Sequence, residues 1–110
     1  MYMLTFVLCS LYIPPSTPVI VYDSFISAAQ SVIDFHTGCL FIICGDFNFP
    51  DISWSNDDFG LIYSTPSGPR IQCVPELFSF YNFFQLNQVS NLHGYILDLV
   101  FSNEIRLAVV

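Results

Sequence analysis

The chain has 110 residues, which is enough for one domain with a core of its own. Only 10% of the residues are charged, 54% are hydrophobic, and the formal net charge is -7. This composition excludes a basic nucleic-acid-binding surface built by the chain alone, and it predicts either a missing partner surface or a membrane-bound chain.

A membrane-spanning segment is not predicted, because no run reaches the ~18 uncharged apolar residues that a spanning helix requires. Met1 to Ile13 is apolar, but it lacks a basic lead-in, and Pro14-Pro15 stands where a signal-peptide cleavage site would follow. We therefore expect no membrane association and no secretion, and an intracellular protein in the nucleus or cytoplasm.

The acidic charge is opposed only by Arg70 and Arg106. Acidic clusters attract divalent cations, which reverse the local field. Any phosphate chemistry here is therefore expected to need a metal ion, together with basic residues from elsewhere.

The four cysteines, Cys9, Cys39, Cys44 and Cys73, form no Cys-x-x-Cys pair. Cys39 and Cys44 lie on one predicted strand and face opposite sides, so they cannot bridge to each other. A zinc site made of His36, Cys39 and Cys44 is an alternative that the same strand disfavours. Buried free thiols in a reducing compartment are the expectation.

The first third of the chain predicts a βαβ-like unit. Met1 to Ile13 is predicted to be a strand covered on both faces. A helix should follow, with Thr17 as its N-cap, Pro18 at its first position and Thr37-Gly38 at its end. Its core-facing residues, at helical spacing, are Tyr22, Phe25, Ile26, Ala29, Val32 and Ile33. Cys39 to Cys44 is then a buried second strand.

The polar stretch from Phe49 to Pro69 is predicted to be a loop. Three exposed carboxylates, Asp51, Asp57 and Asp58, are expected to form turns there, and Trp54 should anchor the loop on the core. No internal repeat and no second domain is indicated.

A second helix is predicted to open at Pro75-Glu76, because proline and an acidic residue are favourable in a first turn. Its buried face should be formed by Val74, Leu77, Phe78, Tyr81 and Phe84. Gln85 to Val89 is expected to be a short strand, Ser90 to Gly94 a turn, and Tyr95 to Ser102 a further strand.

The turn Gly45-Asp46-Phe47-Asn48 is the first candidate site. In an extended segment Asp46 and Asn48 point to one side and Phe47 to the other. A buried strand that delivers a carboxylate and an amide to the surface in this way could hold a metal-bound phosphate.

Asp98 is the second candidate, because it shares one strand face with Ile96 and Val100. A carboxylate in that setting is costly unless it is exposed, hydrogen-bonded or paired. It either faces water at a strand edge or orients an imidazole in an acid/base pair. His36, at a helix end, and His93, in a turn, are expected to be structural or exposed.

These residues resemble a known family. The apolar strand with Gly45-Asp46-Phe47-Asn48, followed by Phe49 to Trp54, is similar to the central motif of the endonuclease/exonuclease/phosphatase superfamily. The form is the one found beside the reverse transcriptases of non-LTR retrotransposons. Three further stretches agree in order and spacing: Tyr12 to Pro15, Phe84 to Val89, and Ile96 to Asn103.

The resemblance implies an α/β fold that is part of a DNase-I-like two-layered β-sandwich flanked by helices, with residues 1–110 as a central portion lacking N-terminal and C-terminal parts. It also implies phosphodiester hydrolysis that nicks target DNA, usually with Mg²⁺. By motif position, Asp46 would orient or deprotonate the attacking water, Asn48 would help bind the phosphate and the metal, and Asp98 would orient a histidine. The implied partners are DNA and either the missing parts of the domain or a fused reverse transcriptase.

The sequence also departs from the family pattern. The metal-binding Glu and the catalytic His have no counterpart by motif position, and Ser90 to Gly94 lacks the Pro-Thr-Arg expected before the last strand. We therefore expect the chain to be inactive alone. The alternatives are a phosphatase of the same superfamily and a non-catalytic interaction module or decayed product.

Overall fold

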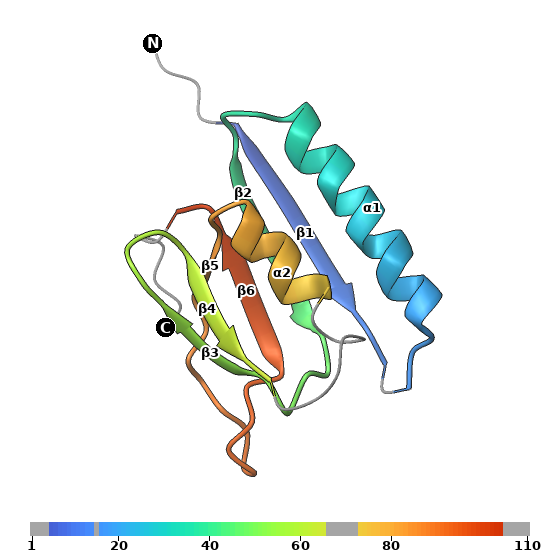
Figure 1. Ribbon diagram of the computed structural model, residues 1–110, viewed down its shortest axis with the longest axis vertical. Coiled ribbons are helices and arrows are strands. Elements are labelled where there is room, and N and C mark those ends of the chain that lie inside the picture. The colour runs from blue at the N-terminus through green and yellow to red at the C-terminus, as the bar shows by residue number, and fades with distance from the viewer. Residues whose placement is uncertain (1–4, 15, 66–72, 105–110) are drawn as a thin grey trace.

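A computed structural model describes residues 5–14, 16–65 and 73–104 (Figure 1). Its elements are β1 (Phe6–Tyr12), α1 (Val19–Phe35), β2 (Leu40–Asp46), β3 (Ser53–Asn56), β4 (Leu61–Ser64), α2 (Cys73–Phe80), β5 (Phe84–Gln85) and β6 (Asp98–Ser102). Four strands form a sheet in the order β1-β2-β6-β5, and β3 and β4 form a separate hairpin. This arrangement confirms the α/β class and is compatible with part of a DNase-I-like fold.

The predicted βαβ start is confirmed, since β1 pairs in parallel with β2 and α1 connects them. Both helices lie over one face of the sheet (Figure 1). Of the predicted helix face, Ala29 and Ile33 are buried, and Tyr22, Phe25 and Ile26 pack against the core. Four parts of the sequence-based predictions lie outside the described residues: residues 1–4, Pro15, the end of the predicted 49–69 loop, and both arginines.

The expected capping of α1 is wrong. Pro18 is the N-cap and makes no side-chain capping hydrogen bond. The Thr17 hydroxyl instead donates to the Pro14 carbonyl at 2.6 Å, so it stabilises the turn before the helix. At the other end the C-cap is His36, whose backbone N–H donates to the Val32 carbonyl at 3.1 Å, and Gly38 follows with φ of 87°. The glycine supplies the left-handed conformation that ends many helices.

The core is largely aromatic and lies between the sheet, both helices and the hairpin. Phe47, Phe78 and Phe101 are fully buried. The rings of Phe78 and Phe101 stack with centroids 4.2 Å apart, and Trp54 packs edge-on against Phe101 at 5.5 Å. Trp54 therefore anchors the hairpin on the sheet, as predicted.

Among the described residues nothing covers the second face of β1, which corrects the expectation that both faces of the first strand are covered. On β1, Phe6, Leu8 and Tyr12 are 57%, 72% and 64% exposed, while the alternating residues Val7, Cys9 and Leu11 turn toward α1 and the core. Residues that alternate along a strand reach opposite faces, so within the described part of the chain β1 packs on its α1 side alone.

The loop predicted from Phe49 to Pro69 contains the β3–β4 hairpin, which was not predicted. Its turn is closed by Asp57, whose carboxylate accepts hydrogen bonds from the N–H groups of Phe59 and Gly60 at 2.7 and 3.0 Å. Asp51, Asp57 and Asp58 are exposed, as expected. The strands escape prediction because each has four residues and only one or two apolar side chains that point inward.

The later elements are shorter than predicted. α2 buries Val74, Leu77 and Phe78 but ends at Phe80, so Phe84 belongs to β5 rather than to the helix. β5 ends at Gln85 and does not extend to Val89, and β6 begins at Asp98 rather than at Tyr95. Along β6 the predicted alternation is confirmed, since Leu99 and Phe101 are fully buried and Asp98 is exposed.

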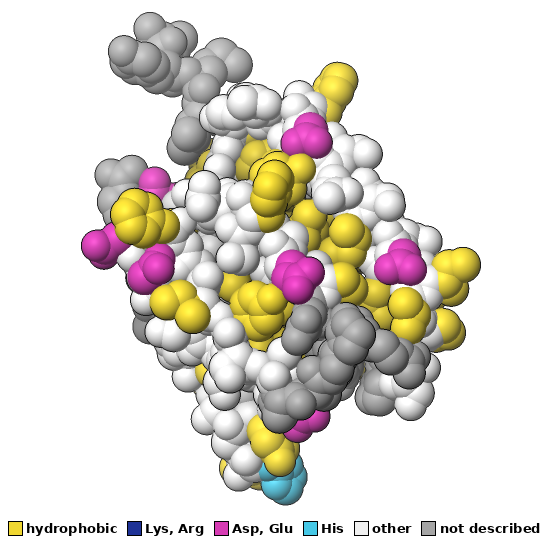
Figure 2. All heavy atoms as spheres, in the orientation of Figure 1, with side chains coloured by type: hydrophobic (Ala, Val, Ile, Leu, Met, Phe, Trp, Pro, Cys, Tyr) yellow, Lys and Arg dark blue, Asp and Glu magenta, His cyan; other side chains and the backbone are white. Residues whose placement is uncertain are grey.

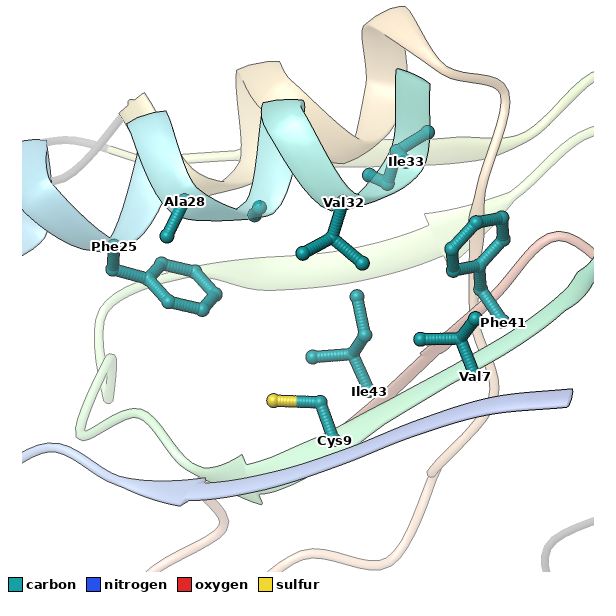
Figure 3. Close-up of a pocket in the computed structure, with 9 residues that line it drawn as sticks. Val7, Cys9, Phe25, Ala28, Val32, Ile33, Phe41 and Ile43 are labelled. Atoms are coloured by element: carbon teal, nitrogen blue, oxygen red, sulfur yellow. The ribbon is translucent and has the colours of Figure 1, made fainter. Parts of the chain in front are cut away.

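An apolar pocket of about 150 Å³ lies between α1 and the sheet (Figure 3). Phe25, Val32 and Ile33 point into it from the helix, and Cys9 and Ile43 point into it from β1 and β2. No disulfide joins the four cysteines, all of which are described. No helix among the described residues combines the length and the hydropathy that crossing a bilayer demands.

Candidate active site

The two candidate carboxylates lie side by side at one end of the sheet. Asp46 ends β2, Asp98 begins β6, and the antiparallel register places these residues directly opposite each other. Directly opposed residues project from the same face, with Cβ atoms about 5 Å apart. Tyr12 is the partner of Asp46 on β1 and is 64% exposed, so a phenol and two carboxylates form a row across three strands on the uncovered face.

Strand β2 reaches this end only because Gly45 has no side chain. A Cβ at Gly45 would lie 1.9 Å from the carbonyl oxygen of Leu11 on β1. The close backbone approach lets β1 and β2 continue side by side to Tyr12 and Asp46, where the Asp46 carbonyl then accepts a hydrogen bond from Ile13 N–H at 2.8 Å.

The turn after Asp46 fixes one of its carboxylate oxygens. Asn48 has φ of 52°, which ends the extended conformation, and its N–H donates to Asp46 Oδ1 at 3.0 Å. Phe47 is fully buried, and its N–H donates to the Leu97 carbonyl at 3.2 Å, next to Asp98. The turn therefore ties the β2 end to the residue that precedes the second carboxylate.

The side chain of Asn48 does not join the carboxylate pair. Its amide donates to the Ile13 carbonyl, and it is absent from the lining of the cavity beside Asp46. Side chains do not alternate between the two faces beyond Asp46, because the left-handed conformation of Asn48 turns the backbone. Asn48 acts here on Asp46 through its backbone N–H.

A cavity of about 200 Å³ opens beside the pair. Its lining combines both carboxylates with amide, hydroxyl and apolar groups from the segment that joins β5 to β6: Asp46, Asn87, Val89, Ser90, Asn91, Tyr95, Leu97 and Asp98. The cavity is the place in the described fold where Asp46 and Asp98 meet other polar side chains.

The segment between β5 and β6 is shaped by Asn91. Its Oδ1 accepts hydrogen bonds from the N–H groups of His93 and Tyr95 at 2.9 and 3.0 Å, and Gly94 has φ of 83°. This loop extends beyond the end of the sheet (Figure 1), and Leu92 and His93 are exposed on it. Neither His93 nor His36 lines the cavity, and the His36 ring contacts the Val32 carbonyl at 2.9 Å.

Sequence reasoning missed three amide side chains that support the site, Asn56, Gln85 and Asn87. Gln85 is fully buried and Asn87 is 7% exposed. Asn87 Nδ2 donates to the backbone carbonyl of Asp98 at 2.6 Å. The available signal was the presence of Gln85 and Asn87 at alternating positions after the apolar pair Phe83-Phe84, although the neighbouring Gln88 weakens the pattern.

The described residues carry carboxylates but no lysine or arginine side chain. The carboxylates are scattered over the helix-covered face in Figure 2. Asp46 and Asp98 therefore face each other without a side-chain cation among the described residues. Like charges directly opposite in a sheet repel, so a bound cation would relieve this pair.

The donor set fits a magnesium ion that is shared with a phosphate. The described residues contain no group of three or more His, Cys, Asp or Glu side chains that could hold a metal, which also leaves the zinc alternative at His36, Cys39 and Cys44 without support. Mg²⁺ commonly keeps several waters and uses one or two carboxylates together with substrate phosphates. Asp46 and Asp98 supply that number of carboxylates.

The thiols of Cys9 and Cys73 are not activated as nucleophiles. Burial raises the pKa of the Cys9 thiol, and the nearby Cys44 raises it further. Burial, with a contribution from Asp23, also raises the pKa of Cys73. Because the thiolate is the reactive form, a raised pKa disfavours thiol catalysis at neutral pH.

The family model described as endonuclease-reverse transcriptase matches residues 6–106, which spans every described element. No curated protein and no solved structure matches the chain. The chain belongs to the endonuclease-reverse transcriptase family.

Proposed function

We propose that Asp46 and Asp98 are the carboxylates of a metal-dependent site that cleaves phosphodiester bonds in DNA. The observation that carries this proposal is their direct opposition across β2 and β6, at a polar cavity on the uncovered face. The family supports it, because its description names an endonuclease. Nicking a target site for reverse transcription is the role proposed with it, and a location in the nucleus or cytoplasm is part of the same proposal.

Each carboxylate has a different environment and hence a different role. Asp46 Oδ1 is held by the Asn48 N–H, which leaves the second oxygen, unbonded by any described residue, to orient a water molecule or accept its proton. Asp98 is exposed directly opposite Asp46, so it can bind the same cation. Tyr12, in register with Asp46, can donate a hydrogen bond to a phosphate oxygen.

Mg²⁺ is the proposed cofactor, with Asp46 and Asp98 as its protein ligands. Bound Mg²⁺ supplies positive charge that stabilises charge developing on a phosphate. Asn48, a metal ligand by motif position, contributes through its backbone contact with Asp46, because its side-chain amide donates to Ile13.

We also propose that the described residues do not suffice for activity. They place neither a third acidic ligand nor a histidine at the pair. The uncovered face, where Phe6 and Leu8 are exposed, is the surface on which the second sheet of a DNase-I-like sandwich is proposed to pack. That partner, or a fused reverse transcriptase, supplies the missing ligand, the histidine and the basic residues that contact DNA.

Plasmid nicking tests the proposal. The 110-residue chain is compared with a longer version of the domain that also carries the upstream acidic residue and the downstream histidine implied by the resemblance. With Mg²⁺, the longer version should nick supercoiled DNA and the short chain should not. Asp46→Asn and Asp98→Asn in the longer version should each abolish nicking, whereas Asp58→Asn, which changes an exposed carboxylate in the β3–β4 turn, should leave it intact.

Two results would overturn the proposal. Nicking that survives both site substitutions would show that other residues carry the reaction. Release of inorganic phosphate from small phosphoesters without DNA nicks would assign the phosphatase alternative.

A further inference from the structure

The segment that follows β5 runs beside β6 without forming a regular β-ladder, and it contacts the backbone of Asp98. β5 pairs with β6 only at Phe84 and Gln85, yet the following residues stay beside β6. One backbone hydrogen bond continues the pairing, from Leu86 N–H to the Val100 carbonyl at 2.8 Å.

Side-chain amides replace the remaining ladder hydrogen bonds. Gln85 Oε1 accepts from Val100 N–H at 3.3 Å, and Asn87 Nδ2 donates to the Asp98 carbonyl at 2.6 Å. The free edge of β6 between Asp98 and Val100 is therefore held by two amide side chains rather than by a partner strand. A strand end without these hydrogen bonds would fray, and Asp98 would move with it.

The two amides are themselves fixed. Gln85 Nε2 donates to the Asn87 carbonyl and Gln85 Oε1 accepts from Asn87 N–H, both at 2.8 Å. Asn56 of β3 pairs with the Gln85 backbone through both atoms of its amide, at 2.9 and 3.0 Å. Both Gln85 and Asn87 are buried, so no rotamer freedom remains to loosen the network.

We propose that Asn87, held by Gln85 and Asn56, is a positioning residue that fixes Asp98 opposite Asp46. Asn87 lines the cavity with both carboxylates and acts through the Asp98 backbone. This inference rests on the proposed function, since it concerns the same carboxylate pair. Partners that orient metal ligands typically change metal affinity 10–100-fold when removed, so the expected effect of Asn87→Ala is about tenfold or more.

Asn103, an exposed residue, provides a control at the opposite end of the same strands. Its Oδ1 accepts from Phe41 N–H at 3.0 Å and its Nδ2 donates to the Cys39 carbonyl at 2.9 Å. Asn103→Ala therefore removes the same kind of side-chain to backbone bonds, but far from the carboxylates.

The test is Mn²⁺ affinity of the 110-residue chain, measured by electron paramagnetic resonance of free Mn²⁺ and paired with urea unfolding. Asn87→Ala should weaken binding about tenfold or more, and Asn103→Ala should change it less than twofold although both variants lose stability. Equal weakening by the two substitutions would overturn the proposal, because it would reveal a general effect of stability.

A second variant covers the case in which Asn87→Ala does not fold. Asn87→Asp has the same shape and keeps the acceptor for Val89 N–H, a 3.1 Å bond, but it cannot donate to the Asp98 carbonyl. Because the added carboxylate by itself attracts Mn²⁺, this variant is measured by amide hydrogen exchange in metal-free buffer: exchange at the Asp98 end of β6 should become faster than in wild type and in Asn103→Ala, and unchanged exchange there would overturn the proposal. Failure of the wild-type chain to bind Mn²⁺ would count against the proposed metal site itself. Mn²⁺ binding that Asn87→Ala leaves unchanged would refute only the positioning role of Asn87.

Discussion

Replacing Gly45 by alanine should separate β1 from β2 and destabilise the fold. The added Cβ would lie 1.9 Å from the Leu11 carbonyl oxygen and 2.8 Å from its carbonyl carbon. Both distances are shorter than 3.0 Å, the shortest contact that Cβ atoms make in real proteins. Both obstructing atoms are backbone, so the strands must move apart by about 1 Å, which is costly in a packed core. We expect a loss of about 3 kcal/mol, from overpacking together with weakened ladder hydrogen bonds.

Urea unfolding followed by Trp54 fluorescence measures this loss, because the single tryptophan packs on Phe101 in the core. Gly38→Ala is the control, since Gly38 has φ of +87° but nothing within 4 Å of the added atom. Backbone strain alone should cost it about 1 kcal/mol. Equal losses for the two variants would refute the close approach of β1 and β2 at the candidate site.

Three further outcomes follow from the structure. In metal-free buffer, Asp46→Asn should raise the free energy of unfolding in urea by up to about 1 kcal/mol. The substitution removes the repulsion with Asp98 and keeps an acceptor for Asn48 N–H. A lower free energy of unfolding would contradict the opposed register. Leu8→Lys should change the unfolding free energy by less than about 0.5 kcal/mol, whereas Leu99→Lys should prevent folding, because Leu8 is 72% exposed and Leu99 is fully buried. The hydrogen bond to Asp34 raises the pKa of Tyr81. Wild type should therefore be more stable than Tyr81→Phe at pH 7, and this difference should vanish as the pH rises above the ordinary tyrosine range. A difference that persists at high pH would contradict this contact.

The elements with strong periodicity were predictable from the sequence. Ile33 and Ala29 recur at helical spacing, and Leu99 and Phe101 alternate with Asp98, so burial of one face fixes α1 and β6. The hairpin of β3 and β4 was not predictable in the same way. Its strands are held by Trp54 packing on Phe101, a residue far away in the chain.

The candidate site was predictable in its carboxylates but not in its assembly. Asp46 and Asp98 stand out because each interrupts an apolar run, but their opposition depends on the register of β2 with β6. The supporting amides Gln85 and Asn87 owe their role to tertiary hydrogen bonds, which no local pattern encodes. Asn48 was predicted to share the site through its side chain, and its left-handed backbone conformation redirects that amide to Ile13.

The most direct measurement is Mn²⁺-induced line broadening in the amide NMR spectrum of the chain. The carboxylate pair predicts that substoichiometric Mn²⁺ broadens the amides of Asp46 and Asp98 first, together with cavity residues such as Asn91, and that Asp46→Asn removes this effect. Broadening centred instead on the exposed Asp57 and Asp58 turn, unchanged by Asp46→Asn, would contradict a metal-dependent site at the end of β2 and β6.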